Sequence, residues 1–194
     1  MKQDCSNREN ILACAQRLFY EKGYDSVGVQ EIVDTAGITK PTMYYYFKSK
    51  QGLLESLLEQ GGKRMLDSLK EAIQIDGSYE QILQNVVRSY ITTALENKEF
   101  YLMLVSLFSS ARDHEGYKVA KPYITEMLHV TRGLFERLGK EHKSIQGRED
   151  YLAISLNGII TYYMLVSFER GLTEETLLND TIVQNITSQF TMWE

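Results

Sequence analysis

Residues 30–50 read QEIVDTAGITKPTMYYYFKSK, and this stretch has the pattern of two short helices joined by a tight turn. We predict a first helix over Gln30–Ala36 and a second helix over Lys40–Phe47. Gly37 ends the first helix, because glycine adopts positive φ without strain. Thr39 offers a hydroxyl that can cap the second helix. The stretch is therefore predicted to be a helix-turn-helix.

The second predicted helix has one inward and one outward face. Met43 and Phe47 are four residues apart and are expected to point into the core. The side chains expected to point outward are Lys40, Pro41, Tyr44 and Tyr45. A proline and tyrosines on so short an exposed surface indicate that this surface contacts a partner.

The residue types of this surface suit double-stranded DNA. Between Ile38 and Lys50 there are three lysines and no acidic residue, although the whole chain has a formal net charge of −5. Lysine can donate to guanine in the major groove, and proline or an aromatic ring can pack on a thymine methyl group. Hydroxyl groups and the N-terminus of the next helix are suited to phosphate oxygens.

Many positions between Phe19 and Leu54 agree at fixed spacing with one known family. They are Gly23-Tyr24, Ile32, Ala36-Gly37-Ile38-Thr39-Lys40 and Tyr44-Tyr45-Tyr46-Phe47-Lys48-Ser49-Lys50. This run resembles the DNA-binding domain of the tetracycline-repressor (TetR) family. So many agreeing positions make the resemblance specific, although it covers only the first part of the chain.

The resemblance implies which side chains contact DNA. Base contacts would fall on Gln30, Lys40, Pro41 and Tyr44. Phosphate contacts would fall on Thr39, Thr42, Tyr45, Tyr46 and Lys50. The sequence departs from the family at Gly28, where the family usually has a Thr or Ser that caps the first helix of the motif. Glycine can still cap a helix, but a hydroxyl that would contact phosphate is lost.

Length and composition indicate an all-α protein with two functional parts. The 194 residues include only two prolines, and no alternating Val/Thr-rich segments are evident. Residues 1–50 are expected to form a three-helix DNA-binding domain, and residues 51–194 a helical domain for effector binding and dimerisation. Through residue 50, Lys and Arg number seven against six acidic residues, and the remainder has 14 against 20. This asymmetry supports a DNA-facing end and an acidic body.

Two apolar segments near the C-terminus predict a homodimer. Tyr151–Phe168 contains no charged residue, which raises a membrane span as an alternative, but its many polar groups argue against insertion. We expect a helix that is buried on one side in its own chain and on the other against a second copy. A terminal helix over Glu174–Met192 would join it, with an apolar stripe at Leu178, Ile182, Ile186 and Phe190. The family forms such dimers, which suit a palindromic DNA site.

The family keeps a small-molecule pocket in the helical body. By helix face and resemblance, the candidate lining is Tyr90, Phe100, Met103, Leu104, Phe108, Tyr123, Met127 and Tyr162. Aromatic and methionine side chains suit a flat, largely apolar effector, although each of these residues can also be ordinary core. An inward-facing Glu96, Glu99, Glu126 or Glu136 would favour a cationic effector. In the helix after residue 49, Gly61-Gly62 marks either a bend or a close approach of another helix.

The sequence indicates neither an enzyme nor a cofactor site. It has no phosphate-binding glycine loop, no H-E-x-x-H and no G-x-S-x-G. Asp113-His114-Glu115 as a metal site and Cys5 with Cys14 as a redox pair are the weaker alternatives. The first ten residues contain no apolar run, so we expect a cytoplasmic protein without a membrane segment.

The sequence thus predicts a ligand-responsive transcriptional regulator, most often a repressor in this family. Its partners would be a double-stranded DNA operator, a small-molecule effector and a second copy of the chain. Two alternatives remain open: a regulator that is controlled by a protein partner or has no effector, and a body domain with an enzymatic activity that the sequence hides.

Overall fold

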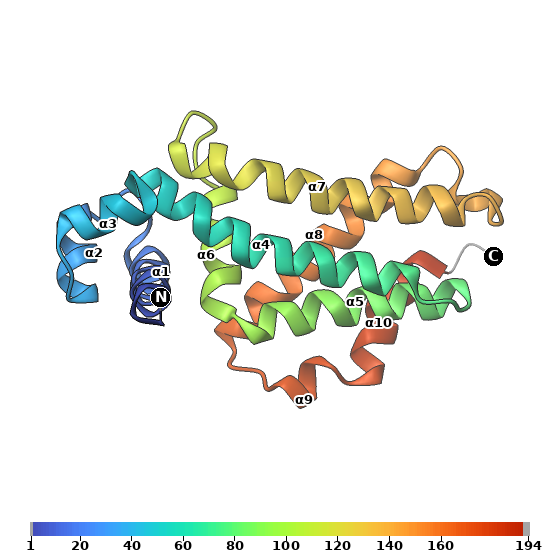
Figure 1. Cartoon of the computed structure of the whole chain (residues 1–194). Helices are drawn as coiled ribbons and strands as arrows, with labels where there is room; N and C mark the ends of the chain where they lie inside the picture. Colours follow the sequence, from blue (N-terminus) through green and yellow to red (C-terminus); the bar gives the residue numbers. More distant parts are fainter. Residues whose placement is uncertain (1, 192–194) are drawn as a thin grey trace. The chain divides into compact units, whose positions relative to one another are not determined.

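Within the residues that the structure describes, the chain folds into helices joined by loops. This computed structural model describes the backbone of residues 2–191 and the side chains of residues 7–191. The helices, drawn in Figure 1, are α1 (Lys2–Lys22), α2 (Val29–Ala36), α3 (Lys40–Phe47), α4 (Lys50–Gln74), α5 (Tyr79–Glu96), α6 (Lys98–Phe108), α7 (Glu115–Leu138), the 3₁₀-helix η1 (Lys143–Ile145), α8 (Glu149–Glu169), α9 (Glu174–Leu177) and α10 (Asp180–Thr191). No β-strand occurs within residues 2–191, and the predicted all-α class is confirmed.

The helices divide into two compact units. The first comprises Met1–Lys63 and Asn97–Ile124, and the second comprises Arg64–Glu96 and Thr125–Glu194. α4 and α7 each contribute residues to both units. The functional boundary expected after residue 50 stays a prediction, because compactness and function divide a chain by different criteria.

α1 supplies the core against which the helix-turn-helix is built. Its inner face has apolar residues at helical spacing that are all buried, namely Ile11, Ala15, Leu18 and Phe19. α1 packs against both α2 and α6. The side-chain amide of Asn10 donates to the Ala36 carbonyl at 2.9 Å, which ties α1 to the end of α2. The ring of Tyr24 meets the ring of Phe19 edge-on, with centroids 5.0 Å apart.

The turn between α2 and α3 has the predicted geometry. Gly37 has φ 65°, in the left-handed region that favours glycine. The N–H of Ile38 donates to the Val33 carbonyl at 3.0 Å, as in a glycine-terminated helix end. Thr39 Oγ accepts from the N–H of Thr42 at 3.4 Å and caps α3. α3 therefore begins and ends at the predicted residues.

The connection from α3 to α4 is tighter than the sequence indicates. Among the described residues, Lys48 is the one non-glycine residue with positive φ, at 64°. The N–H of Ser49 donates to the carbonyl of Phe47, two residues back, at 2.7 Å. Such a γ-turn is strained for a residue with a side chain. The hydroxyl of Ser49 accepts from the N–H of Gly52 at 2.9 Å, and this cap of α4 offsets part of the strain.

Two glycines of α4 let aromatic rings approach the helix backbone. A Cβ at Gly61 would overlap the ring of Phe100 from α6. A Cβ at Gly62 would lie 2.6 Å from Cδ1 of Tyr123 from α7. Phe100 is only 3% exposed, so its ring has no free space to move into. Gly61-Gly62 was predicted to mark either a bend or a close approach of another helix. The structure supports the close approach.

The second unit has α8 and α10 packed against α5. A capping box forms at the start of α5. The N–H of Ser78 donates to Gln81 Oε1 at 2.9 Å, and the N–H of Gln81 donates to Ser78 Oγ at 3.3 Å. Inside the unit, the hydroxyl of Tyr90 donates to Asn157 Oδ1 at 2.5 Å and lies 3.2 Å from the hydroxyl of Thr131. These polar groups satisfy one another and join α5, α7 and α8.

The prediction of one terminal helix over Glu174–Met192 is wrong. The structure has two helices there, α9 and α10, and Met192 lies outside the described residues. Asn179 sits in the break, and its side-chain oxygen caps α10 by accepting a backbone N–H two residues further on at 2.9 Å. From α5, the guanidinium of Arg88 donates to the carbonyl of Leu178 at 2.7 Å. A capping residue and a tertiary contact thus interrupt the apolar pattern.

The break also changes which apolar residues face the core. Leu177 and Val183 are fully buried, whereas Leu178 and Ile182 of the predicted stripe are only half-buried. The last two residues of that stripe, Ile186 and Phe190, are buried as expected. A pattern with steps of four residues holds only while the helix is continuous.

Replacing Gly61 by alanine is expected to lower the free energy of unfolding by about 1–3 kcal/mol, because an added methyl group must displace the buried Phe100 ring. The matched control is Gly133→Ala in α7, where a Cβ would meet nothing within 4 Å. The control should be neutral or raise the free energy of unfolding by up to about 1 kcal/mol. Denaturant unfolding followed by circular dichroism measures both variants, and equal behaviour would contradict the close approach.

Gly28→Ser is expected to stabilise the protein. Gly28 caps α2 without a side-chain hydrogen bond, and a Cβ there would meet nothing within 4 Å. A serine hydroxyl can accept an N–H from the first turn of α2, so the serine variant should be about 0.5–2 kcal/mol more stable than Gly28→Ala. Thermal unfolding of the two variants side by side measures this difference. A serine variant no more stable than the alanine variant would show that α2 gains nothing from a side-chain cap.

Candidate nucleic-acid interface

α3 has two faces with opposite environments. Met43 is completely buried, and Phe47 is 4% exposed. The base-contacting candidates of this helix, Lys40, Pro41 and Tyr44, are exposed. Tyr45 is 69% exposed, more than a tyrosine that belongs to a core. The structure therefore brings these candidates together on one outward surface, as the sequence predicts.

Gln30 is the base-contacting candidate of α2, and it is exposed. Its side-chain amide donates to Asp34 Oδ1, one helical turn further on, at 2.7 Å. The amide thus lies along the surface of α2. To reach the edge of a base, Gln30 would exchange this hydrogen bond for one to DNA.

The hydroxyl-bearing candidates gather at the two ends of α3. At its start, the hydroxyls of Thr39 and Thr42 lie 2.9 Å apart. At its end, the rings of Tyr45 and Tyr46 meet edge-on with centroids 5.1 Å apart. Tyr46 is half-buried, and its ring is tilted against that of Phe47, with centroids 6.0 Å apart. Two of the four hydroxyl groups therefore flank each end of the helix.

Lys50 differs from the other phosphate candidates, because its charged group contacts backbone carbonyls of the protein itself. Its ammonium donates to the carbonyls of Tyr24 and Val27 at 3.0 and 3.2 Å, and it lies 4.1 Å from the centre of the Tyr24 ring. These partners belong to the loop between α1 and α2, far from Lys50 in the sequence. The sequence alone therefore offers no sign of this role, and the assignment of Lys50 to phosphate stays a prediction.

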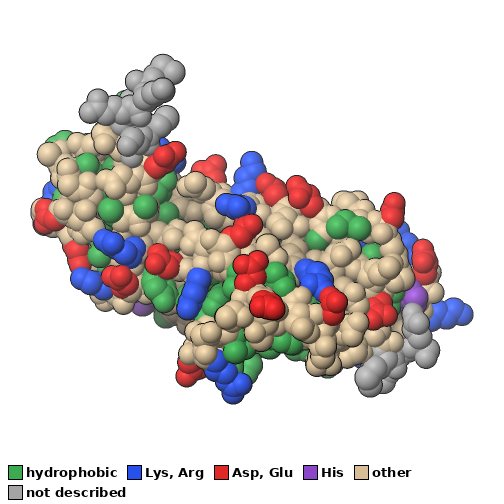
Figure 2. All heavy atoms as spheres, turned by 90° about the horizontal axis from the view of Figure 1, so that it is seen from below, with side chains coloured by type: hydrophobic (Ala, Val, Ile, Leu, Met, Phe, Trp, Pro, Cys, Tyr) green, Lys and Arg blue, Asp and Glu red, His purple; other side chains and the backbone are tan. Residues whose placement is uncertain are grey.

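The positive charge of the surface is local. Lys40 and Lys48 are both exposed, and the ammonium of Lys48 lies 3.4 Å from the carbonyl oxygen of Tyr45. On the face of the molecule drawn in Figure 2, acidic and basic side chains are interspersed and no large area has a single sign. Site-specific binding by a chain with net negative charge requires such local cations.

The eight predicted effector-lining residues divide between the two units. Those in the first unit are Phe100, Met103, Leu104, Phe108 and Tyr123, and those in the second are Tyr90, Met127 and Tyr162. Tyr162 is 71% exposed and Phe108 is 41% exposed. Phe108 ends α6 and stacks on Tyr117, with ring centroids 5.7 Å apart. α6 is therefore exposed to solvent at its last residue.

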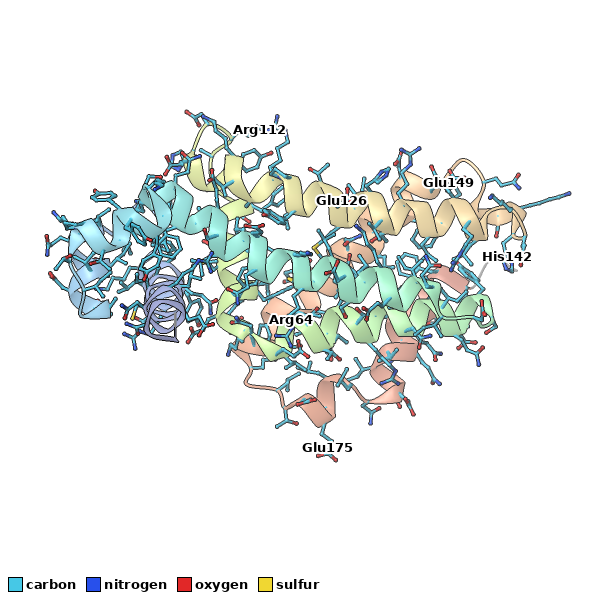
Figure 3. All side chains as sticks on the ribbon, viewed as in Figure 1. Arg64, Arg112, Glu126, His142, Glu149 and Glu175 are labelled. Carbon is cyan, nitrogen blue, oxygen red and sulfur yellow. The ribbon has the colours of Figure 1, made fainter. Side chains whose placement is uncertain are left out.

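The carboxylates considered for a cationic effector are mostly engaged in exposed ion pairs within the second unit. Arg64 lies 3.0 Å from Glu96, and Lys70 lies 3.3 Å from Glu126. Figure 3 labels Arg64 and Glu126 on their helices. Glu136 pairs at 3.1 Å with the arginine one turn before it. This arrangement gives no support to a cationic effector.

α8 leaves one apolar face uncovered in its own unit. Tyr151, Ile154 and Tyr162 recur at helical spacing and are 64%, 58% and 71% exposed. Among the described helices, α8 alone is long and apolar enough to cross a membrane, with a mean hydropathy of 1.4. Its other face packs against α5 and α10, as a core helix does. Contiguous exposed apolar side chains indicate an interaction surface.

The alternative metal site at residues 113–115 is not assembled. The imidazole of His114 lies 3.1 Å from Asp25 Oδ2, and the carboxylate of Glu115 accepts from the Tyr24 hydroxyl. Both side chains thus contact the loop after α1. Among the described residues, no group of three or more His, Cys, Asp or Glu side chains could hold a metal ion. Cys14 is half-buried, and the side chain of Cys5 lies outside the described residues.

Comparison with known proteins agrees with this geometry. The model of the tetR family of bacterial regulatory proteins matches residues 11–57, which include all of α2 and α3. The transcriptional activator FasR of Mycolicibacterium smegmatis is 26% identical over 157 residues, or 78% of this chain and 68% of that protein. Several other curated relatives are matched over less than two thirds of their own length.

Solved structures share the fold over nearly the whole chain. A Clostridium perfringens protein, proposed to be a fatty acid metabolism regulator, has a TM-score of 0.80 at 22% identity and covers 92% of this chain and 97% of its own. The transcriptional regulator FadR of Bacillus subtilis, solved in complex with stearoyl-CoA, has a TM-score of 0.75 at 18% identity, with coverage of 93% and 95%.

The two faces of α3 and the glycine-terminated turn before it are thus the helix-turn-helix of the matched family. Together with these relatives, they show that the chain is a DNA-binding transcriptional regulator that belongs to the tetR family of bacterial regulatory proteins.

Proposed function

We propose that this regulator is a homodimeric repressor that binds a palindromic operator and leaves it when an effector with a long apolar part binds. The observation that carries the proposal is the exposure of Lys40, Pro41 and Tyr44 on α3, a helix that a fully buried Met43 anchors in the core. A helix anchored by its inner face can present these side chains to the major groove.

Each candidate has a distinct role in DNA binding. Lys40 would donate to guanine, and Pro41 and the ring of Tyr44 would pack on thymine methyl groups. The side-chain amide of Gln30 would give up its hydrogen bond to Asp34 and form hydrogen bonds to adenine. The hydroxyl candidates Thr39, Thr42, Tyr45 and Tyr46 would contact phosphate oxygens. Phosphate contacts set the register, and the base contacts supply the sequence preference.

The exposed face of α8 supports a homodimer. A second copy would cover Tyr151, Ile154 and Tyr162, whose apolar surface is otherwise exposed to water. An exposed apolar patch of this kind is typical of an interaction site. α10 packs against α8 and would take part in the same isologous interface. Two equivalent reading helices would then contact the two halves of a palindrome.

A long-chain acyl-CoA is the effector class that we propose first. The fold neighbour FadR was solved with stearoyl-CoA, and another neighbour is proposed to regulate fatty acid metabolism. In this chain, Phe100, Met103 and Leu104 are buried on α6, and such side chains suit an acyl chain. Effector binding would favour a spacing of the reading helices that no longer fits the operator. Repression is the proposed sign, although FasR is named an activator.

The two alternatives make different predictions. A regulator that is controlled by a protein partner, or that has no effector, would bind its operator equally well with and without acyl-CoA. A body with a hidden enzymatic activity would change the bound compound chemically. Mass spectrometry of the recovered ligand separates this last case from simple binding.

Selection of duplexes from a random pool at physiological salt tests the proposed function. Enrichment of a palindrome would support a dimeric, sequence-specific regulator. The winning duplex then serves as a probe in the presence of stearoyl-CoA, with free coenzyme A as the control. Release by stearoyl-CoA alone supports the proposed effector, and failure to enrich any duplex would count against operator binding.

Lys40→Ala is expected to weaken binding to the selected duplex by about 1–3 kcal/mol and to relax the preference at one position of each half-site, because a base contact is lost. Lys140→Ala changes an exposed lysine of the second unit and should leave binding as it is. Titration of both variants against the selected duplex and its single-base variants measures the effect. Unchanged preference in the Lys40 variant would contradict its assignment to a base.

Ile154→Glu is expected to break the dimer, because it places an unpaired charge in an apolar interface. We expect the dimer dissociation constant to rise about 30-fold or more, equivalent to roughly 2 kcal/mol. Ile75→Glu is the matched control, since Ile75 is 51% exposed in the same unit and lies at the end of α4. Sedimentation analysis measures both. A dimer of unchanged strength in the Ile154 variant would exclude this face as the interface.

A further inference from the structure

We propose that Lys50, Tyr24 and Glu115 form a positioning chain that ties the first residue of α7 to the loop from which α2 begins. In this assignment, which rests on the proposed DNA-binding function, Lys50 is a positioning residue and not a phosphate ligand. The resemblance to the family points to the opposite role for Lys50, so the two assignments can be separated by experiment.

The first link is the ammonium of Lys50. It donates to the carbonyl oxygens of Tyr24 and Val27 at 3.0 and 3.2 Å, and the face of the Tyr24 ring lies 4.1 Å away. An ammonium has three N–H donors, and two of them are used by these carbonyls. A cation over a tyrosine ring adds further attraction. An additional phosphate contact would compete with interactions that the folded protein already makes.

These contacts act on the segment that sets the direction of α2. Tyr24 is 5% exposed and Val27 is 1% exposed, so the loop is held at both buried side chains. Gly28 follows directly and is the N-cap of α2. Because Lys50 is the first residue of α4, its ammonium links the start of α4 to the start of α2, on either side of α3.

The second link is the hydroxyl of Tyr24, which donates to the carboxylate of Glu115. Burial of the phenol, followed by the hydrogen bond to Glu115, raises the pKa of Tyr24 well above its ordinary value. The phenol therefore stays protonated at any pH that the protein meets, and it remains a donor to the carboxylate. Glu115 is the first residue of α7, so this series of contacts ends on a helix outside the helix-turn-helix.

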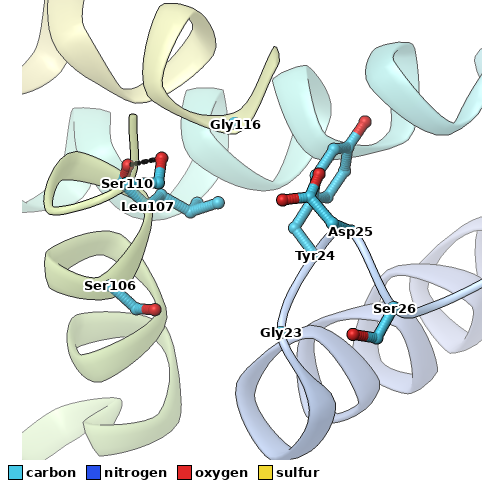
Figure 4. A pocket seen from close by; sticks show the side chains of 8 residues that line it. All are labelled: Gly23, Tyr24, Asp25, Ser26, Ser106, Leu107, Ser110 and Gly116. Atoms are coloured by element: carbon cyan, nitrogen blue, oxygen red, sulfur yellow. Dashed lines mark hydrogen bonds between the residues drawn. The ribbon is translucent and has the colours of Figure 1, made fainter. Parts of the chain in front are cut away.

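The residues around the Tyr24–Glu115 hydrogen bond pack closely, but a cavity lies beside them. A Cβ at Gly116 would lie 2.6 Å from Cδ2 of Leu107 and 3.6 Å from Cδ1 of Tyr24, so glycine is needed for the approach. Figure 4 shows a partly open cavity of about 150 Å³ beside this hydrogen bond, lined by the loop at residues 23–26 and by Ser106, Leu107, Ser110 and Gly116.

A parallel contact joins the same two segments. His114 Nδ1 lies 3.1 Å from Asp25 Oδ2, and both side chains are exposed, at 49% and 65%. Exposed pairs of this kind contribute little. The partly buried contacts of Tyr24 are therefore the main connection, and a displacement of the first turn of α7 would reach α2 through them.

The experiment compares Lys50→Met, which removes the charge and keeps the apolar stem, with Tyr24→Phe, which removes only the hydroxyl. Lys118→Met is the control, because Lys118 is an exposed lysine of α7. Hydrogen exchange of the amides of residues 23–28 reads the loop directly. Affinity for the selected duplex at several salt concentrations counts the phosphate contacts, since each lost contact lowers the slope by about one.

We expect faster exchange at residues 23–28 in both Lys50→Met and Tyr24→Phe and no change in the control. Both variants should bind the duplex about 10-fold more weakly or worse, with the salt slope of the wild type. Glu115→Ala should act in the same direction as Tyr24→Phe, and the combination of the two should add nothing further, because both remove one bond.

Two results would overturn the positioning chain. One is unchanged exchange at residues 23–28 in Lys50→Met or Tyr24→Phe. The other is a salt slope that falls by about one per half-site in Lys50→Met, which would make Lys50 a phosphate ligand. If the wild type selects no duplex, the proposed function fails. The hydrogen-exchange measurement still decides whether the contacts of Lys50, Tyr24 and Glu115 hold the loop at residues 23–28.

Discussion

The burial of Met43 and Phe47 is the constraint on which the DNA-reading surface depends. An α-helix repeats every 3.6 residues, so two anchored side chains one turn apart set the direction of all the others on a helix as short as α3. Met43 is fully buried, and the guanidinium of Arg8 from α1 lies 5.4 Å from the centre of the Phe47 ring. Tyr45, about half a turn round the helix from both, is 69% exposed for this reason. The surface is therefore preorganised by the core beneath it.

The same anchor explains the strained corner that follows. Phe47 ends α3 in the core, and Leu53 and Leu54 at the start of α4 are completely buried. Only a few residues separate these fixed points, and the chain reverses between them through the positive φ of Lys48. Strain of this kind persists where the surrounding packing determines the position of both ends. The Lys50 ammonium then fastens the corner to the loop before α2, which makes the helix-turn-helix a closed set of contacts.

α8 illustrates how one helix can serve two environments. Its uncharged length predicts burial on two sides, and a single chain covers one of them, with Asn157 held by Tyr90 in the interior. The other side exposes Tyr151, Ile154 and Tyr162. A helix that is apolar all round is stable only when both faces are covered. The second unit by itself leaves that requirement unmet, which is the physical reason for proposing a second copy.

Local chemistry determined much of this protein from the sequence. Helix ends at Gly37, Thr39 and the Ser78–Gln81 box were predictable because each depends on residues within one turn of each other. The inward faces of α1 and α3 followed from periodicity, and the resemblance over Phe19–Leu54 implied which exposed residues would contact DNA. The grouping of the base-contacting candidates of α3 on one face is a consequence of the same short-range rules.

Only the tertiary structure decided what depends on residues far apart in the chain. The division of the terminal segment into α9 and α10 involves the hydrogen bond from Arg88 of α5 to the Leu178 carbonyl. The exposure of Phe108 depends on which other elements pack against the end of α6. The Tyr24–Glu115 bond and the carbonyl partners of Lys50 join segments 91 and 26 residues apart. Sequence patterns report local propensity and the period of apolar positions, whereas such contacts are selected by packing of the whole unit. For that reason the exposed residues of α3 were predictable and the contacts that hold the helix in place were not.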